Sequence, residues 1–378
     1  MKRLICLDVL RGLTIVLMVL VNNPGSWQTV YWPLLHAQWH GLTPTDLVFP
    51  FFIFAMGVAI PFSSYRQQGG SAGAMLVRIL KRSVLLFLCG LFLALFYYNP
   101  YNPDFDWVRD RLENIRVMGV LQRLALVYFF TAILAMCLRI RGLLFVAVLL
   151  VAAYWAAMTF IPYADAAGTL HQGQWAYGNS LAAWIDAGVL GKHHVYYSTA
   201  MPFPFDPEGL LSTMPAVSTC LCGVMCGLCL QREAEMPALK MAGAGIILIL
   251  AGGVMALWVP VNKALWSPGF TALTAGCAMG CLALLHWITD LRGYQRWAQP
   301  FIIAGANSIV FFMLSGIAAR LLFMIPAGSG SLKAAIYQSV FLPYFSPFNA
   351  SFLFAVSFLC VMFLPVWWMY RKHWFIRL

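Results

Sequence analysis

Charged side chains are scarce in this sequence. Aspartate, glutamate, lysine and arginine make up 10% of the 378 residues, whereas hydrophobic residues make up 62%. Ordinary soluble domains carry about 25% charged and about 45 to 50% apolar residues. A chain with so little charge cannot cover a water-soluble fold with polar surface, so a soluble protein is excluded.

Acidic residues are the scarcer sign of charge, with 13 aspartates and glutamates against 24 lysines and arginines and a formal net charge of +11. The excess does not indicate nucleic-acid binding, because the basic residues gather on alternate connections between apolar runs, as the positive-inside rule describes for cytoplasmic loops. With the N-terminus inside, the connections on the far side carry only Arg109, Arg111, Arg116, Lys192, Lys263 and Lys333. We therefore predict an N-in and C-in protein with no nucleic-acid partner.

Cysteine occurs ten times, but every cysteine lies in or beside an apolar run and none lies in a far-side connection. This excludes a disulfide framework, since no cysteine stands where an oxidising compartment would pair it. Cys222, Cys226 and Cys229 share a helix face without a second set of ligands, so helix packing is the preferred interpretation and no metal is predicted. The opening MKRLICLDVLRG lacks a small-residue cleavage site, which favours a retained first helix.

Long apolar runs recur along the chain, each near the ~20 residues that a helix needs to cross a bilayer. The runs are continuously apolar, whereas the strands of a membrane barrel alternate, so the sequence predicts an all-α polytopic membrane protein. We expect one transmembrane domain over residues 1–378 with about ten spans. They lie at 8–24, 46–62, 76–98, 116–137, 142–161, 209–230, 239–259, 268–288, 299–325 and 349–370.

Ionisable residues inside a span are costly and therefore mark candidate sites. Arg11 and Asn22 are eleven residues apart, which places them within about 20° on one helix face and about 16 Å apart along it. This spacing suits a long ligand lying across the membrane; the alternative is an Asp8–Arg11 pair that only anchors the helix end. The other polar residues of the predicted spans include Gln122, Arg123, Asn307, Ser308 and Arg320. Together they indicate a polar cavity, with a structural pair such as Arg123 with Asp46 as the alternative.

The segment LLHAQWHGLTPTDLVFPFFIFAMG, residues 34–57, runs from a far-side connection into the second predicted span. It brings His36, His40, Thr43, Thr45 and Asp46 to the membrane interface. A histidine titrates near neutrality and can accept a proton from a nucleophile. An interfacial hydrogen-bonding role is the alternative for His36, and zinc binding by His36 and His40 is disfavoured because their spacing lies in a loop.

Five ordered motifs resemble the heparan-α-glucosaminide N-acetyltransferase family and its bacterial relatives. They are LDVLRGLTIVLMVLVNNPG (7–25), HAQWHGLTPTDLVFPFF (36–52), GVLQRLALVYF (119–129), DPEGLLSTMPA (206–216) and PFIIAGANSIVFF (300–312). The resemblance implies an enzyme that moves acetyl from acetyl-CoA to the amine of a glucosamine-type sugar across a membrane. It matches the essential histidine of the family to His36 and the active-site asparagine to Asn22. The resemblance breaks at His40, a position where the family's eukaryotic members look like they carry Asn.

The resemblance and the topology together predict roles for the remaining residues. Cytoplasmic cations, with Arg11, Arg78, Lys81 and Arg82 as candidates, would hold the nucleotide phosphates of acetyl-CoA. Its pantetheine arm would thread the polar cavity, which we assign to Gln122, Arg123, Asn307 and Ser308. Asp46 would orient the imidazole of His36 or bind the sugar amine, and His40, Asp206 and Glu208 would recognise the acceptor. Direct transfer and transfer through an acetylated His36 use the same residues.

Two other functions fit the same pattern. A transporter would use the buried polar residues for an amino sugar, and a different acyltransferase would modify a hydroxyl on a cell-envelope polysaccharide. The chain is expected in a bacterial inner membrane with its long connections in the periplasm, and the resemblance favours a homodimer in the bilayer.

Overall fold

The computed structural model describes residues 4–62, 71–231, 236–328 and 330–376. The α-helices are α1 (Ile5–Val21), α2 (Val48–Ala59), α3 (Ala72–Leu95), α4 (Val120–Cys137), α5 (Ile140–Phe160), α6 (Leu181–Val189), α7 (Thr213–Gln231), α8 (Pro237–Met255), α9 (Pro268–His286), α10 (Gln299–Ala306), α11 (Ser308–Met324), α12 (Leu332–Ile336) and α13 (Pro347–Arg371). A 3-10 turn, η2 (Pro44–Leu47), precedes α2, and a π-helical turn, η6 (Trp287–Leu291), extends α9.

The strands of the described chain are two residues long and form three antiparallel hairpins. They are β1 (Tyr163–Ala164) with β2 (Leu170–His171), β3 (Trp175–Ala176) with β4 (Asn179–Ser180), and β5 (Pro326–Ala327) with β6 (Gly330–Ser331). Helices therefore carry the fold, and the predicted all-α class is confirmed.

Each of the ten predicted spans is helical. In the described residues seven helices are long and apolar enough to cross a bilayer, and the pair Arg296–Ala306 with Ser308–Met324, bent by 72°, makes an eighth if it counts as one span. The two other predicted spans are α1, with 17 residues, and α3, whose first half carries Arg78, Lys81 and Arg82. The structure thus supports a polytopic helical membrane protein, while the count of ten and the orientation stay predictions.

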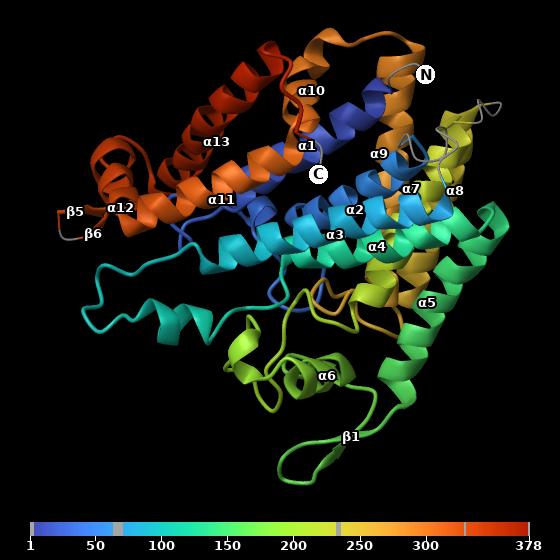
Figure 1. Cartoon of the computed structure of the whole chain (residues 1–378), viewed down its shortest axis with the longest axis horizontal. Coiled ribbons are helices and arrows are strands. Elements are labelled where there is room, and N and C mark those ends of the chain that lie inside the picture. Colours follow the sequence, from blue (N-terminus) through green and yellow to red (C-terminus); the bar gives the residue numbers. More distant parts are fainter. Residues whose placement is uncertain (1–3, 63–70, 232–235, 329, 377–378) are drawn as a thin grey trace.

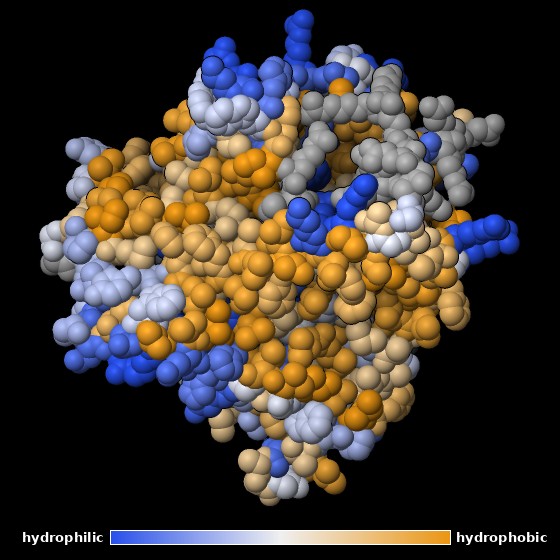
Figure 2. Space-filling view, viewed as in Figure 1, coloured by the Kyte–Doolittle hydropathy of each residue, from blue (hydrophilic) through white to orange (hydrophobic). Residues whose placement is uncertain are grey.

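The surface has a broad apolar zone between polar ends. Figure 2 shows hydrophobic side chains covering the middle of this face and hydrophilic ones gathered above and at the lower left. Exposed apolar residues of α5 include Leu144, Phe145, Val148 and Leu149. Exposure of such an apolar helix face to water would be unfavourable, whereas contact with lipid would not.

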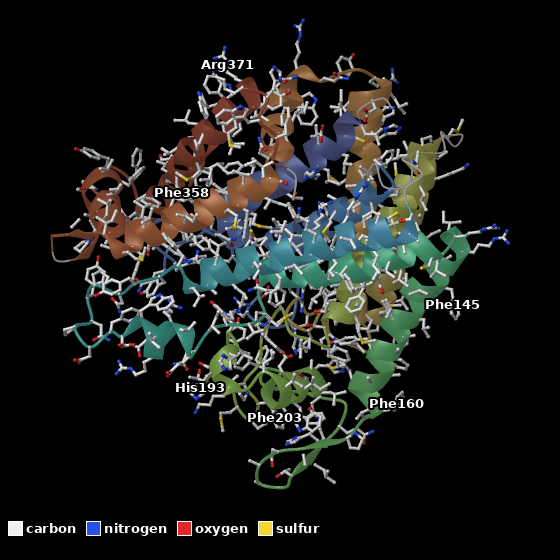
Figure 3. The ribbon with its side chains drawn as sticks, viewed as in Figure 1. Phe145, Phe160, His193, Phe203, Phe358 and Arg371 are labelled. Carbon is white, nitrogen blue, oxygen red and sulfur yellow. The ribbon has the colours of Figure 1, made fainter. Side chains whose placement is uncertain are left out.

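The long connection between α5 and α7 forms a layer at one end of the helices. In Figure 1 the helix α6 and the β1 hairpin lie at the bottom, whereas the labelled N-terminus lies at the top. Figure 3 shows the same separation, with His193 and Phe203 below and Arg371 above. The layer has its own core around Tyr154, Phe203 and Leu265, which attaches it to α5 and to the chain before α9.

Glycines allow α2 and α7 to pack backbone to backbone. A Cβ atom on Gly57 of α2 would fall onto the carbonyl of Cys220, and a Cβ on Gly223 of α7 would fall onto the carbonyl of Phe54. Small residues at helix contacts let helices approach closely, which strengthens packing where lipid supplies no hydrophobic driving force. This contact fixes the helix that begins beside Asp46.

We expect Gly57→Ala to destabilise the protein by about 1 to 3 kcal/mol, because the methyl group must push the two helices apart. The thermal unfolding midpoint in detergent, followed by the fluorescence of the 14 tryptophans, should fall by several degrees. Gly253→Ala on α8 is the matched control, since a Cβ there meets nothing within 4 Å. Equal midpoints for the two variants would contradict the close packing of α2 on α7.

Candidate functional site

His36 and Asp46 form the centre of the candidate site. The imidazole Nδ1 of His36 lies 2.7 Å from Oδ1 of Asp46, whose side chain is 1% exposed. The other carboxylate oxygen, Oδ2, accepts the backbone N–H groups of Ala37 at 3.1 Å and Thr43 at 3.0 Å. Thr43 and Asp46 form a capping box at the start of η2, so the local sequence TPTD builds the carboxylate into the helix entry.

This contact sets the role of each imidazole nitrogen. A carboxylate only accepts hydrogen bonds, so Nδ1 of His36 carries the hydrogen and donates it to Asp46. In an imidazole that carries one hydrogen, Nε2 is then left as an acceptor, 3.2 Å from the Nζ of Lys263, and the side chain of His36 is half exposed. The predicted orienting role of Asp46 has the geometry that it needs.

Lys263 completes the cluster, although its role was not foreseen from the sequence. Its Nζ lies 2.9 Å from Nδ1 and 3.2 Å from Nε2 of His36, and 3.6 Å from Oδ1 of Asp46. Burial lowers the pKa of Lys263, while the charges of Asp46 and Glu208 oppose that shift. The ammonium therefore lies beside the imidazole edge that a reacting group would approach.

Asn262 attaches the lysine-bearing loop to the histidine-bearing loop. This residue is fully buried, and its Nδ2 donates to the carbonyl of Trp39 at 2.8 Å. Its Oδ1 accepts the N–H of Leu265 at 2.8 Å, and the N–H of Gly41 donates to the carbonyl of Val261 at 2.8 Å. Gly41 has a φ of 119°, which a side chain would disfavour.

A cavity of about 240 Å³ opens on this cluster. It is lined by His36, Ala37, Gln38, Trp39, Asp46, Phe49, Arg116, Val120, Tyr196, Tyr197, Pro207, Glu208, Lys263, Ala264 and Trp266. Aromatic rings thus surround a few charged groups, an arrangement that is typical of small-molecule sites.

Arg116 holds the two acidic residues that we expected to recognise the acceptor. Its Nε and Nη2 donate to Asp206 at 2.7 Å each, and Nη2 also contacts Glu208. Burial raises the pKa of Asp206. Burial also opposes ionisation of Glu208, but the charges of Arg116, Arg123 and Lys263 prevail and lower its pKa. Glu208 lines the His36 cavity, whereas Asp206 is not among the lining residues.

A larger cavity of about 580 Å³ shares Arg116, Val120 and Tyr196 with the His36 cavity. Gln122 lines it, and this side chain packs against Gly90 of α3, where a Cβ would overlap it. The predicted placement of Gln122 in a polar cavity next to the site therefore has a structural counterpart.

Asn307 and Ser308, which we assigned to the same polar cavity as Gln122, do not line this larger cavity. Arg11 donates from Nη2 to the hydroxyl of Ser308 at 3.2 Å. Asn307 stands at the break between α10 and α11, where its Nδ2 donates to the carbonyl of Trp374 at 2.9 Å and its Oδ1 accepts the N–H of Ile376 at 3.0 Å. Asn307 thus holds the C-terminal segment.

Arg123 is fully buried, and its partners are not the Asp46 carboxylate suggested as an alternative. Its Nη2 donates to the carbonyl of Gly209 at 3.1 Å and contacts the Ser212 hydroxyl, and its guanidinium lies 5.2 Å from the ring centre of Trp266. Its Nε and Nη1 atoms have no hydrogen-bond partner among the described residues. Arg123 therefore supports the cavity wall from behind Trp266.

The three basic residues of α3 lie together on its first turns. Arg78 and Lys81 are exposed. The guanidinium of Arg82 lies 4.5 Å from the ring centre of Tyr128, and its buried Nε lacks a partner within the described chain. A group of three cations, one of which has an unpartnered Nε, fits an anionic ligand such as phosphate.

Asn22 and His40 also lie outside the His36 cavity lining. Asn22 is exposed at the C-terminal end of α1, where its N–H donates to the carbonyl of Met18 at 3.2 Å. His40 is exposed, its Nδ1 lies 3.4 Å from Nδ2 of Asn262, and burial lowers its pKa. The structure therefore brings together His36, Asp46 and Glu208 but not these two.

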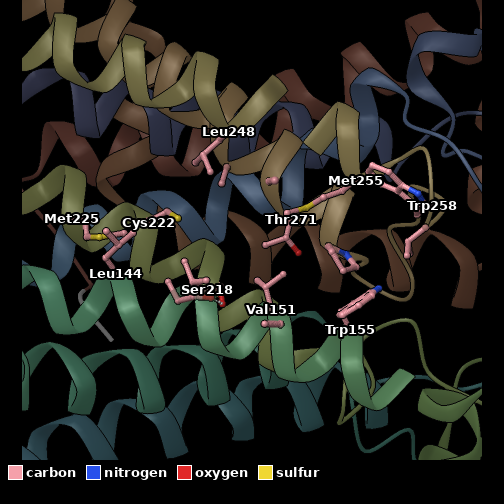
Figure 4. Close-up of a pocket in the computed structure, with 17 residues that line it drawn as sticks. Leu144, Val151, Trp155, Ser218, Cys222, Met225, Leu248, Met255, Trp258 and Thr271 are labelled. Carbon is pink, nitrogen blue, oxygen red and sulfur yellow. Dashed lines mark hydrogen bonds between the residues drawn. The ribbon is translucent and has the colours of Figure 1, made fainter. Parts of the chain in front are cut away.

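An apolar cavity of about 430 Å³ lies between α5, α7, α8 and α9 (Figure 4). Apart from Ser218, Cys222 and Thr271, all of its lining side chains are apolar. The cavity offers an apolar concave surface to lipid. Its lining contains no histidine or carboxylate that could carry a proton.

Comparison with known proteins places the chain. A family model described as a domain of unknown function (DUF5009) matches residues 3–154. The chain is 31% identical over 358 residues to heparan-alpha-glucosaminide N-acetyltransferase of Mus musculus and 30% identical over 357 residues to that of Homo sapiens. Each match covers 82% of this chain but 53% and 52% of the relatives, so the chain spans about half the length of the curated relatives it matches.

The helices and the cavity define a polytopic membrane protein with a histidine–carboxylate site at the entry of one helix. The predicted resemblance to this family is confirmed, and the chain is a distant relative of the heparan-alpha-glucosaminide N-acetyltransferases.

Asp186 on α6 gives the far-side layer a pH dependence. Its carboxylate is 1% exposed and accepts the N–H groups of Leu210 at 2.9 Å and Asp206 at 3.2 Å. Burial raises its pKa to about 6. Because the folded protein takes up this proton more readily than the unfolded chain, the contribution of Asp186 to stability increases as the pH falls from 7 towards 5.

We expect acidification from pH 7 to pH 5 to stabilise the wild type relative to Asp186→Asn by about 1 kcal/mol, the value of one pH unit of differential protonation. Thermal unfolding midpoints of both proteins across this range provide the measurement. Asp104→Asn is the control, because Asp104 is an exposed carboxylate in the connection between α3 and α4. Parallel pH profiles for wild type and Asp186→Asn would show that Asp186 does not titrate there.

Proposed function

We propose that the protein is a membrane N-acetyltransferase that moves acetyl from cytoplasmic acetyl-CoA to the amine of a glucosamine-type sugar on the periplasmic side of a bacterial inner membrane. The observation that carries the proposal is the His36–Asp46 pair, 2.7 Å apart, opening on a cavity with aromatic walls. The relationship to N-acetyltransferases supports the same reaction class.

His36 serves as the general base in this proposal. A sugar amine attacks the carbonyl carbon of the thioester, and Nε2 of His36 takes the proton that the nitrogen loses as the C–N bond forms. The C–S bond then breaks, and the imidazolium returns the proton to the departing sulfur. Asp46 keeps the ring in the required tautomer and stabilises the imidazolium, since its carboxylate is fixed by two backbone N–H groups. Transfer through an acetylated Nε2 would use the same pair.

Lys263 stabilises the oxyanion that forms when the thioester carbonyl is attacked. Its Nζ lies within 3.2 Å of both imidazole nitrogens, so a group reacting at Nε2 comes within reach of the ammonium. A lowered pKa makes the ammonium a stronger hydrogen-bond donor to a developing negative charge. Asn22, which the family resemblance nominated, would need to reach this point from the exposed end of α1.

Acetyl-CoA would approach from the face that carries Arg78, Lys81 and Arg82. The unpartnered Nε of Arg82 and the exposed cations beside it fit the phosphates. The pantetheine arm would reach His36 past Gln122, through the cavity that shares a wall with the site. Arg11 with Ser308 is a second place for an anionic group.

The acceptor would bind against the aromatic walls. Trp39 and Tyr196 offer flat apolar faces to a sugar ring, while Glu208, whose pKa is lowered, offers a negative charge to the ammonium of an amino sugar. The carboxylate attracts the protonated amine, which first loses one proton to water and becomes the nucleophile; His36 then takes the second proton as the C–N bond forms. An amine acceptor therefore fits this cavity better than a hydroxyl.

We expect His36→Ala to lower acetyl transfer from labelled acetyl-CoA to glucosamine by about 10²- to 10⁴-fold in purified protein, the usual contribution of a positioned base. CoA binding, measured by calorimetry, should be unchanged, because the phosphates bind elsewhere. His373→Ala is the matched control, since His373 is exposed at the far end of α13. Full turnover by His36→Ala would remove this residue from the reaction.

The acceptor product separates the proposal from its rivals. Label in N-acetylglucosamine supports amine transfer, and label in an ester supports a hydroxyl acceptor. Uptake of amino sugar into vesicles without CoA, together with no transfer, would identify a transporter instead.

We expect Lys263→Met to lower kcat by about 10²-fold with little change in the KM for acetyl-CoA, because an oxyanion donor acts only in the transition state. Methionine keeps the length of the side chain and leaves the His36–Asp46 contact in place. Lys263→Arg should recover part of the activity, since a cation remains. A rise in the KM for the sugar without loss of kcat would instead make Lys263 a substrate-binding residue.

A further inference from the structure

Three potential metal ligands converge at the end of α1 opposite to Asn22. Cys6 comes from the first turn of α1, and His286 and Asp290 come from the end of α9 and from η6. The Sγ of Cys6 lies 3.9 Å from Nδ1 of His286, which lies 3.3 Å from Oδ2 of Asp290. All three ligand atoms lie within 4.8 Å of one another, and this is the only such group among the described residues.

These distances suit a tetrahedral zinc ion. With bonds of about 2.0 to 2.3 Å, two ligands of one zinc ion lie about 3.3 to 3.6 Å apart. The His286–Asp290 separation already has this value, the Cys6–His286 separation exceeds it by a few tenths of an ångström, and the Cys6–Asp290 separation is within 4.8 Å. A donor set of thiolate, imidazole and carboxylate binds zinc in preference to calcium or magnesium.

The carboxylate is already oriented by neighbouring groups. Oδ1 of Asp290 accepts the N–H of Ile5 at 3.1 Å, and Oδ2 accepts the N–H of Cys6 at 3.0 Å and the hydroxyl of Thr289 at 3.2 Å. Fixed second partners of this kind hold ligands in place around a metal. The π-helical turn η6 places His286 and Asp290 on one side despite its wider winding.

Charge also favours a cation at this place. Cys6 is fully buried, His286 is 7% exposed, and the Asp290 side chain is 14% exposed. A divalent ion would neutralise the Asp290 carboxylate and a Cys6 thiolate, two charges that are costly to bury alone.

We propose that Cys6, His286 and Asp290 bind a zinc ion that joins the beginning of α1 to the end of α9. A water molecule would take the fourth position. The site lies away from the His36 cavity and is independent of the proposed acetyl transfer. Its role is structural, because it clamps the N-terminal end of the helix that carries Arg11 and Asn22.

The test uses the full chain, purified through a tag that does not bind metal. After incubation with zinc and dialysis, elemental analysis should find about one zinc ion per wild-type chain. Cobalt(II) added instead should give the near-ultraviolet thiolate charge-transfer band that marks a cobalt–sulfur bond. Zinc should also raise the thermal unfolding midpoint of the wild type.

Cys6→Ser and His286→Ala should bind zinc more than tenfold more weakly, since even loss of an outer partner costs roughly this much. Cys6→Ser should also lose the cobalt band. The backbone N–H groups of residues 5 and 6 still donate to Asp290 in this variant, so it should stay folded. Cys281→Ser, a cysteine of α9 outside the cluster, is the matched control and should behave as the wild type. Trace zinc and no cobalt band in the wild type would overturn the proposal and leave Asp290 as a helix cap only.

Discussion

The site depends on the hydrogen bonds that the carboxylate of Asp46 accepts. It is nearly inaccessible to solvent, and its two oxygens are shared between the His36 imidazole and the N–H groups of Ala37 and Thr43. An ion in such surroundings stays charged only when each lone pair has a partner. The same hydrogen bonds that begin the helix at η2 therefore hold the histidine ring, and the helix itself is held by glycine packing against α7. Fold and site share one set of contacts.

The cost of burying polar groups explains where the other ionisable residues lie. In a membrane protein an unpaired charge is expensive, so each buried one is expected to find a partner on another helix. Arg116 is bound by Asp206 and Glu208, Arg11 by Ser308, and Asn307 by the C-terminal segment. A polar residue in a span is therefore evidence for a contact first. It becomes evidence for a ligand only where donor capacity is left over, as at Arg82.

The sequence predicted the parts of the structure that depend on neighbouring residues. The helices follow from runs of apolar residues, and His36 and Asp46 are ten residues apart in one motif, so their contact is local. Lys263 is 227 residues from His36, and no local pattern links them. The only signal was its place among the few basic residues of the far side. The break at Asn307 was also missed, because its polar side chain was interpreted as lining a cavity, whereas its partners lie near Trp374, far away in the sequence.

The separation of charges along the molecule gives the site its direction. Cations of α3 lie in one set of turns, whereas in the His36 cavity the carboxylates of Asp46 and Glu208 are balanced by Arg116 and Lys263. An anionic donor is favoured at the first place, while the second carries no excess charge of either sign. A reaction that joins such a donor to an acceptor in the His36 cavity needs only the uncharged part of the donor to pass between the helices. The amide side chain of Gln122, in the cavity that borders the site, offers that part polar contacts, and the lining of the same cavity includes Arg111, Arg116 and Arg320.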